Sequence, residues 1–497
     1  MPTILEDSAI AVDPSVREFL SRPMKLFING EFVEAADGGT FATYDPATAE
    51  EITPIARAQK EDIDRAVAAA KAALPAWSKL PPNQRARVLL KLADLVEENV
   101  DKIAQTDSLD LGKPLVVARD YDVPFVADVF RYYAGWATKA HGETLDSGWP
   151  DTHVYTKKQP IGVVGAIIAW NFPLTLLSWK VAPALAAGCT VVLKPAEQTP
   201  LSALIFAELC AEAGVPDGVV NVCTGIGEEA GAALVAHPDV RKISFTGSLE
   251  VGRLIAQQAA RDLKHVTLEL GGKSPNIIFA DADIEVAAAQ AAQAIFFNSG
   301  QVCCAGSRLM VEKPVYDQVL EIVTDEANNH KLGAGLDPST TLGPLVSEEQ
   351  MNRVRGYLRV GEEEGARLVS GGNGSDLPGY FVEPTIMADV PDHLTVVREE
   401  IFGPVLVAQP FEDVEELTSR ANDTEYGLAA GVWTTDVRKA HRAAEALDAG
   451  TVWINCYNYF DAGVPWGGWK LSGYGKDLGR EAFEKHLETK VVWTNLA

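Results

Sequence analysis

The chain contains few cysteines for its length, and their spacing excludes two common scaffolds. Six cysteines occur among 497 residues, too few and too scattered for the disulfide framework of a small secreted domain. None has the paired CxxC spacing of a zinc site, and the eight histidines form no HExxH motif. We therefore predict free thiols in a reducing compartment and no catalytic metal.

Positive charge and long apolar runs are also scarce. The sequence has 43 Lys and Arg against 69 Asp and Glu, a net charge of −26, so nucleic acid and anionic membranes are not expected partners. The first residues show no basic segment followed by an apolar core, and Asn171 and Pro173 interrupt the apolar stretch 161–179. A cytoplasmic protein is expected.

The periodicity that is present indicates an α/β fold. Helix-period runs at 62–74 and 83–105 come first. Short apolar runs rich in β-branched residues then alternate with amphipathic segments at 161–168, 190–193, 219–222 and 242–245. Such alternation predicts βαβ units and a parallel sheet buried on both faces, here as a Rossmann-like nucleotide domain.

Two segments contain residues suited to covalent catalysis. Cys303 and Cys304 follow Gly-Gln-Val after an apolar, helix-like run at 286–297, and Glu269 stands just before Gly271 and Gly272. A thiol and a carboxylate in tight turns suit a covalent reaction that later needs a general base. Taken alone, adjacent cysteines are also typical of two buried, inert thiols.

Together with other segments, these motifs resemble the aldehyde dehydrogenase superfamily. The resemblance extends from about Leu26 to the C-terminus and is closest to the hydrolytic, class 1/2-like, NAD(P)-dependent members, phenylacetaldehyde dehydrogenases among them. Further matching segments occur, in family order and spacing, at 170–173, 194–197, 245–248, 400–404 and 453–455.

The resemblance implies a role for each catalytic residue. Cys303, the cysteine after Gly-Gln-x, would be the nucleophile. Asn171 and the Cys303 backbone N–H would hold the oxyanion, and Glu269 would activate water for thioester hydrolysis. Lys180 and Asp477 resemble a proton-relay pair, although many relatives have the longer glutamate where this chain has Asp477.

The resemblance also implies NAD as the cofactor. Lys194 and Glu197 would contact the adenosine ribose, where a carboxylate repels a 2′-phosphate, so NAD is expected in preference to NADP. Gly247 and Ser248 would offer helix N-terminal N–H groups to the pyrophosphate. The remaining implied cofactor contacts are Ile168, Trp170, Gly227, Glu400 and Phe402.

The aldehyde is expected to enter an aromatic tunnel. By position, its lining would be Phe125, Phe172, Trp179, Phe297, Phe460 and Trp466. None of these is charged, which favours an arylalkyl aldehyde such as phenylacetaldehyde, or a medium-chain aliphatic one. The same rings would also surround a trimethylammonium group, as in betaine aldehyde, and plain core packing is the third interpretation.

Two other activities are disfavoured. Acyl transfer to CoA belongs to relatives that lack the deacylating glutamate, and this chain has Glu269. A non-catalytic structural relative would be expected to have lost at least one of the catalytic residues, and all are present.

The expected organisation has four parts. Residues 1–22 form an N-terminal tail, 23–140 with 159–272 the NAD-binding domain, and 273–472 an α/β catalytic domain. Residues 141–158 and 484–497 would be strands of a small β oligomerisation flap, giving a homotetramer by resemblance. A dimer, or two edge strands of a monomer, remain alternatives.

Overall fold

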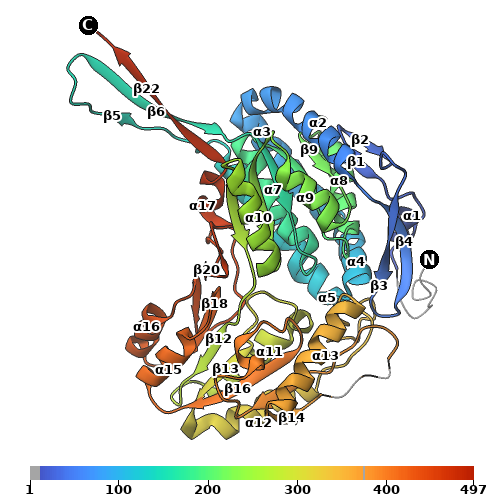
Figure 1. The fold of residues 1–497 in the computed structure, drawn as a ribbon, viewed down its shortest axis with the longest axis vertical. Helices are drawn as coiled ribbons and strands as arrows, with labels where there is room; N and C mark the ends of the chain where they lie inside the picture. Colours follow the sequence, from blue (N-terminus) through green and yellow to red (C-terminus); the bar gives the residue numbers. More distant parts are fainter. Residues whose placement is uncertain (1–11, 373–374, 376) are drawn as a thin grey trace.

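Two α/β units and a projecting ribbon make up the fold (Figure 1). The structure, a computed structural model, describes residues 12–372, 375 and 377–497. In the described part of the chain, no helix is both long and apolar enough to cross a membrane. The mixed α/β architecture with parallel sheets confirms the predicted fold class. The domain boundaries given above remain predictions.

The first unit is built on an eight-stranded sheet of order β2-β1-β9-β8-β7-β10-β11-β21. From β9 to β11 neighbouring strands are parallel. The chain runs outward from β7 to β8 and β9 on one side and to β10 and β11 on the other, so β7 and β10 flank a topological switch point. The strands are β1 (Leu26–Ile28), β2 (Glu31–Val33), β7 (Val163–Ile167), β8 (Thr190–Lys194), β9 (Val220–Val222), β10 (Val240–Thr246), β11 (His265–Glu269) and β21 (Gly473–Tyr474).

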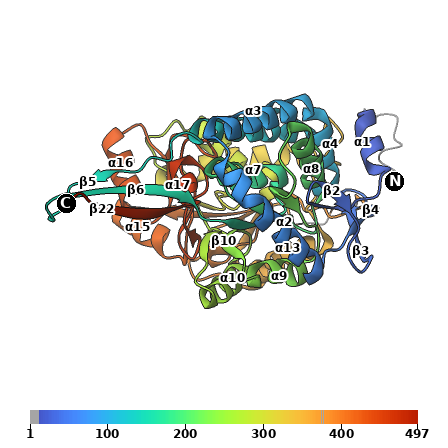
Figure 2. The same cartoon turned by 90° about the horizontal axis from the view of Figure 1, so that it is seen from above.

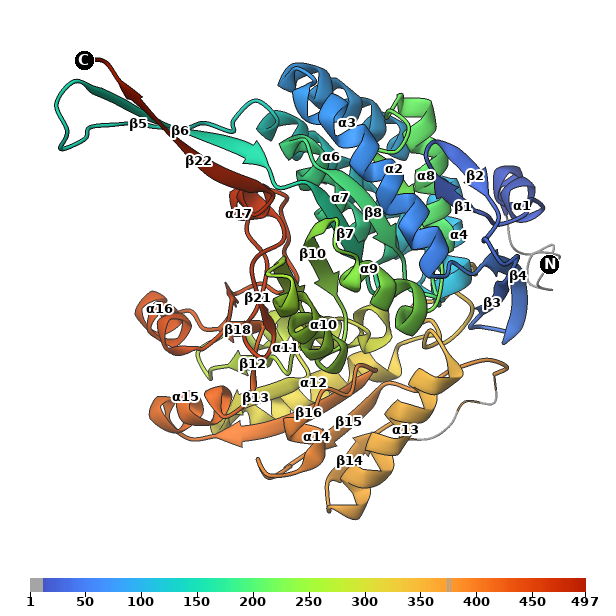
Figure 3. The same cartoon turned by 45° about the horizontal axis from the view of Figure 1, so that its top comes forward.

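Both faces of this sheet are covered, which explains why its strands are continuously apolar. On β7, Val163 and Ile167 pack into one core, and Val164 and Ala166 pack into the other. Figures 2 and 3 show the helices on the two sides. The first core contains α2 (Lys60–Lys79), α9 (Ala232–Ala236) and α10 (Leu249–Arg261), and the second contains α7 (Pro173–Ala187) and α8 (Leu201–Ala213).

The helix-period run predicted at 83–105 forms two helices instead of one. These are α3 (Pro82–Glu98) and α4 (Val100–Leu111). Between them, Asn99 leaves helical geometry at φ −110° and ψ 21°, and its side-chain amide donates to the Leu95 carbonyl at 2.9 Å. A local side-chain hydrogen bond of this kind competes with helix continuation.

The second unit contains a seven-stranded sheet of order β14-β15-β16-β13-β12-β18-β19, parallel except for β14. Residues 270–274 connect it to the first unit by joining β11 to β12. The helices around it include α11 (Ile284–Phe296), α12 (Tyr316–Asn328), α13 (Glu348–Glu363), α15 (Val414–Asn422) and α16 (Val437–Ala446) (Figure 1). The strands are β12 (Pro275–Ile278), β13 (Arg308–Glu312), β14 (Arg367–Ser370), β15 (Thr385–Ala388), β16 (Val405–Phe411), β18 (Ala429–Trp433) and β19 (Thr451–Ile454).

A three-stranded ribbon extends away from the first unit and carries the C-terminus (Figure 1). It consists of β5 (Thr144–Leu145), β6 (Thr152–Pro160) and β22 (Leu487–Asn495), with β22 antiparallel to β6 along its whole length. The two predicted flap segments therefore pair with each other rather than with either large sheet. Tyr155, Val491 and Trp493 are exposed on it.

The N-terminal segment differs from the loose tail expected for residues 1–22. Residues 1–11 lie outside the described residues, but α1 (Pro14–Leu20) follows directly. The Asp13 carboxylate accepts from the Ser15 N–H at 2.7 Å, and the Asp13 N–H donates to Gln105 on α4 at 2.8 Å. Val16 and Phe19 are buried. The capped helix thus docks on the core by an apolar face.

Replacing the cap tests this docking. Asp13→Ala should loosen α1 by about 1 kcal/mol, because a helix N-terminal N–H loses its acceptor. Hydrogen–deuterium exchange should then be faster in peptides covering α1 and unchanged in those covering α8. Arg17→Ala, on the same helix, is the control and should not raise exchange. Equal exchange in Asp13→Ala and the unsubstituted protein would contradict the capping role.

Candidate active site

The loop that carries the two adjacent cysteines has an uncommon backbone. After α11, Asn298, Ser299 and Gly300 have φ values of 49°, 55° and 70°. The left-handed region costs about 1–2 kcal/mol for each non-glycine residue, so such a turn persists only where its surroundings hold it. A Cβ atom on Gly300 would lie 2.0 Å from the Gly403 carbonyl oxygen. The loop therefore packs against the backbone that follows Glu400.

Side-chain amides hold this loop on both sides. The Asn298 amide donates to the Asn171 carbonyl at 3.1 Å, and the Asn171 amide donates to the Gln301 carbonyl at 2.9 Å. The Gln301 side chain in turn accepts from the Val346 N–H at 2.9 Å. Asn171, at the end of the β7–α7 connection, is thereby tied to the loop two residues before Cys303, and one amide hydrogen remains for a further acceptor.

The two cysteines have different surroundings. Cys303 is partly exposed, whereas Cys304 is fully buried. The Tyr457 hydroxyl donates to the Cys304 carbonyl at 2.8 Å, which fixes the buried member. The hydrogen bond to the Cys304 thiol, and then burial, raise the pKa of Cys303 well above its ordinary value. The accessible thiol is thus Cys303, held largely protonated at neutral pH.

Glu269 ends β11 inside the protein. Its side chain is 4% exposed, and in the described structure neither carboxylate oxygen has a hydrogen-bond partner. Burial, followed by the charge of Asp477, raises the pKa of Glu269 well above its ordinary value. A carboxyl group in this state takes up a proton readily, as a general base must.

The predicted relay residues form a buried ion pair. The Lys180 ammonium on α7 lies 2.8 Å from a carboxylate oxygen of Asp477, and both side chains are buried. The aspartate, one methylene shorter than glutamate, therefore still reaches the lysine. Whether the pair moves protons remains a prediction.

The predicted cofactor residues gather where the parallel strands of the first sheet end. Lys194 closes β8, and its ammonium lies 2.7 Å from the Glu197 carboxylate. A Cβ atom on Gly227 would lie 3.9 Å from that carboxylate. The Ile168 N–H donates to the Lys194 carbonyl at 3.2 Å. Strand ends beside a topological switch point are where α/β sheets bind nucleotides.

The neighbouring helix terminus suits an anion. Ser248 caps α10 and accepts from the Val251 N–H at 3.3 Å, directly after Gly247. At the end of β10, the Thr246 hydroxyl is buried, with no partner among the described residues. Helix N–H groups and an unpaired hydroxyl together fit a phosphate-bearing group. The residues present thus fit a dinucleotide.

Glu400 and Phe402 belong to the segment that packs against the connection at Gly271 and Gly272 and against Trp170. The Glu400 carboxylate accepts from the Gly272 N–H at 3.0 Å, and burial raises the pKa of Glu400 to about 7. The Phe402 ring meets Trp170 edge-on, with centroids 5.2 Å apart. Glu400 therefore contacts the connection that passes beside the Cys303 carbonyl, and Phe402 contacts Trp170, next to Asn171. The cofactor roles of these residues remain predictions.

The six predicted tunnel aromatics form two groups. Trp179 on α7 contacts Phe125 on α6 (Val123–Trp136), Phe460 and Trp466, with centroids 6.0–6.5 Å apart. Phe460 is 36% exposed, whereas Trp179 and Trp466 are 7% and 4% exposed. This group thus leads from the surface inward. Trp453, which sequence reasoning missed, also belongs to it and stacks on Trp466 at 6.0 Å.

The second group contains a charge that sequence reasoning also missed. Phe172 stacks on Phe297 at 6.3 Å, and the Lys113 ammonium lies 3.8 Å from the Phe172 ring centroid. Lys113 is buried and pairs with Asp122. The six predicted residues are themselves uncharged, but a charged side chain lies directly against one of them. No pattern around Lys113 in the sequence indicated this contact.

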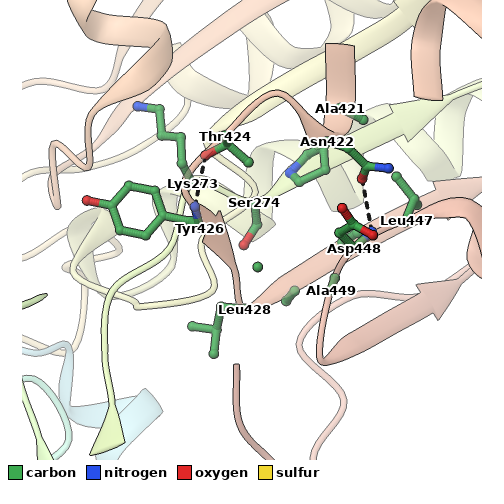
Figure 4. A pocket seen from close by; sticks show the side chains of 14 residues that line it. Lys273, Ser274, Ala421, Asn422, Thr424, Tyr426, Leu428, Leu447, Asp448 and Ala449 are labelled. Carbon is green, nitrogen blue, oxygen red and sulfur yellow. Dashed lines mark hydrogen bonds between the residues drawn. The ribbon is translucent and has the colours of Figure 1, made fainter. Parts of the chain in front are cut away.

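A separate pocket lies beside the start of β12 and contains none of the predicted site residues. Residues from 273–275, 421–430 and 447–449 line it. Figure 4 shows two hydrogen bonds in its lining, from the Tyr426 N–H to the Thr424 hydroxyl and from the Asp448 N–H to the Asn422 side chain. The Lys273 ammonium, also in the lining, is buried without a hydrogen-bond partner among the described residues. We assign this pocket no part in the chemistry.

Comparison with known proteins identifies the family. The aldehyde dehydrogenase family model matches residues 32–492. An NAD+ complex of an aldehyde dehydrogenase from Bacillus cereus is 51% identical, with a TM-score of 0.97 over 98% of this chain and 100% of that one.

Two further relatives carry the names of different substrates. The mitochondrial benzaldehyde dehydrogenase of Antirrhinum majus is 47% identical over 95% of this chain and 89% of its own length. A betaine aldehyde dehydrogenase structure from Staphylococcus aureus is 41% identical, with a TM-score of 0.93 over 95% of this chain and 97% of that one.

The contact between the cysteines predicts a reactivity change. Cys304→Ala removes the first cause of the raised Cys303 pKa, so Cys303 should be alkylated faster by iodoacetamide near neutral pH. A pKa lowered by about one unit would increase the thiolate fraction about tenfold. Peptide mass spectrometry measures the rate at Cys303, and Cys456→Ala serves as the control. A slower reaction in Cys304→Ala would show that Cys304 assists ionisation instead.

Proposed function

The chain belongs to the aldehyde dehydrogenase family, whose members oxidise aldehydes, and we propose that this one uses NAD to convert an arylalkyl or medium-chain aliphatic aldehyde to its carboxylic acid. Cys303 forms the covalent thiohemiacetal and thioester. The observation that supports this most directly is Glu269, a buried carboxylate without a hydrogen-bond partner in the described structure, whose pKa is raised first by burial and also by the nearby Cys303.

The first half of the reaction uses Cys303 and Asn171. The Cys303 thiol loses its proton to solvent, which its partial exposure allows, and the sulfur attacks the aldehyde carbon. The carbonyl oxygen becomes an oxyanion that accepts hydrogen bonds from the Asn171 amide and the Cys303 backbone N–H. Removing such a donor typically lowers the rate by roughly 10²–10³.

The second half depends on Glu269. Its carboxylate takes a proton from water as the water attacks the thioester, the C–S bond breaks, and the carboxylic acid leaves. Lys180 and Asp477 then take part in returning that proton to solvent. Because Glu269 deacylates with water, CoA should not accelerate turnover.

The crevice residues support NAD as the cofactor. Lys194 and Glu197 would hold the adenosine ribose, Gly247 and Ser248 the pyrophosphate, and Glu400 the nicotinamide ribose, with Ile168, Trp170, Gly227 and Phe402 completing the cleft. When bound, NAD supplies the hydride acceptor. The Glu197 carboxylate supports a preference for NAD, since it would repel a 2′-phosphate.

The tryptophan-rich group supports the substrate class. Trp179, Trp453, Phe460 and Trp466 present large ring surfaces that hold an aryl or alkyl chain by buried area. The same rings are the specific observation that favours the alternative, a betaine-aldehyde-type substrate held by cation–π attraction. The exposed apolar ribbon supports a homotetramer, with a dimer as the alternative assembly.

Glu269→Gln separates the two half-reactions. The first turnover should still give a burst of NADH, because Glu269 acts after hydride transfer, while the steady-state rate falls by roughly 10²–10⁴. Stopped-flow absorbance measures both phases. Cys303→Ala is the matched control and should lose both. If Glu269→Gln also loses the burst, Glu269 acts before the thioester forms and the assignment is wrong.

An aldehyde panel tests the substrate class. Initial rates of NADH and NADPH formation with phenylacetaldehyde, benzaldehyde, hexanal, acetaldehyde and betaine aldehyde should give the highest kcat/KM for phenylacetaldehyde or hexanal with NAD. A maximum for betaine aldehyde would establish the cationic alternative. A higher kcat/KM with NADP than with NAD would overturn the role given to Glu197.

A further inference from the structure

Glu269 rests against a backbone wall that only glycine can form. A Cβ atom on Gly467 would lie 2.4 Å from one Glu269 carboxylate oxygen, and Gly467 has φ +151°. Both the space and the backbone angle therefore exclude a side chain there. Because the carboxylate has no hydrogen-bond partner among the described residues, the position of Gly467 limits where the base can sit.

Lys476 fixes that wall. Its ammonium donates to the Gly467 carbonyl. Next to these two residues, the N–H of Trp466, which precedes Gly467, donates to the carbonyl of Asp477, which follows Lys476. The Asp477 N–H donates to the Trp466 carbonyl in return, and both distances are 2.8 Å. The segment beside the base is thus joined to the Lys476 segment by three hydrogen bonds, of which one comes from a side chain.

The lysine has little freedom to point elsewhere. Lys476 is half-buried, and a Cβ atom on Gly450 would lie 3.1 Å from its ammonium and 1.9 Å from the Gly467 carbonyl oxygen. Two glycines, Gly450 and Gly467, thus leave room for one long cationic side chain beside Glu269. A cation confined this way next to a buried carboxylate favours the ionised form of that carboxylate.

We propose that Lys476 is a positioning residue for the general base, holding the Gly467 wall against Glu269 and supplying the positive charge that favours its ionised form. This inference rests on the proposed hydrolytic role of Glu269. It separates Lys476 from its neighbour Asp477, which pairs with Lys180 and raises the proton affinity of the same carboxylate.

The charges that face Glu269 come from three elements. Asp477 raises its pKa, as does Cys303 in the catalytic loop, whereas Lys180 on α7 and Lys476 lower it. Burial is the largest influence and raises the Glu269 pKa. Burial also lowers the pKa of Lys476, while Glu269 raises it. Removing the Lys476 charge therefore moves the Glu269 pKa further upward.

The test is the pH dependence of deacylation in the complete enzyme. Deacylation requires ionised Glu269, so its rate rises with pH through the Glu269 pKa. With phenylacetaldehyde and NAD, Lys476→Met should shift this rise to higher pH by about one unit. On the acid side of the profile, the steady-state rate should therefore be about tenfold lower than in the unsubstituted enzyme. The NADH burst should keep its amplitude. Lys476→Arg, which retains the positive charge, should show the same pH profile as the unsubstituted enzyme.

Two further variants keep the result interpretable. Lys476→Gln retains a donor for Gly467 without the charge and should show the same pH shift, which covers the case in which the methionine variant does not fold. Lys91→Met, an exposed lysine on α3, is the matched control and should leave the profile unchanged.

The outcomes separate this inference from the proposed function. An unshifted profile in Lys476→Gln and Lys476→Met, or equal loss of burst and steady state in both, would overturn the role of Lys476. Absence of any NADH burst in the unsubstituted enzyme would instead overturn the proposed function itself.

Discussion

The active site depends on the close approach of backbone at Gly271 and Gly272, where the chain passes from the first sheet to the second. A Cβ atom on Gly271 would lie 2.1 Å from the Glu400 carboxylate, and one on Gly272 would lie 2.6 Å from the Cys303 carbonyl oxygen. Only residues without side chains let Glu400 and Cys303 meet across this connection. The absence of side chains at Gly271 and Gly272 is therefore a steric condition for bringing the nucleophile loop and Glu400 together.

Around that junction the protein buries several charges, and their balance sets the chemistry. Lys180 and Asp477 neutralise each other inside the fold, whereas Glu269 is left without a hydrogen bond in the described structure. An unpaired buried carboxyl group favours its protonated form. Lys476 opposes this preference from one side and Asp477 reinforces it from the other. Two residues adjacent in sequence thus act in opposite directions on one base.

The β-branched runs predicted the strands from local periodicity. The candidate site residues came instead from the resemblance to the family, whose nucleophile follows Gly-Gln-x, and this position distinguished Cys303 from Cys304. The sequence did not indicate which residues from distant segments would contact one another. Nothing near Lys476 indicates that its ammonium would reach Gly467, and the run that includes Asn99 retains helical periodicity through the break. Such contacts depend on how distant segments pack, which periodicity does not encode.

The substrate class, like these contacts, depends on how distant aromatic residues pack together. The six aromatic positions, taken as a set, favoured a neutral aldehyde and left a cationic one as the alternative. In the structure these six residues form two groups, and in one of them the Lys113 ammonium lies over the Phe172 ring. A cationic substrate would meet the Lys113 charge beside Phe172 and would have to rely on the other group, Trp179, Trp453, Phe460 and Trp466. A neutral aryl or alkyl chain would meet no such repulsion beside Phe172, which supports the proposal of a neutral substrate.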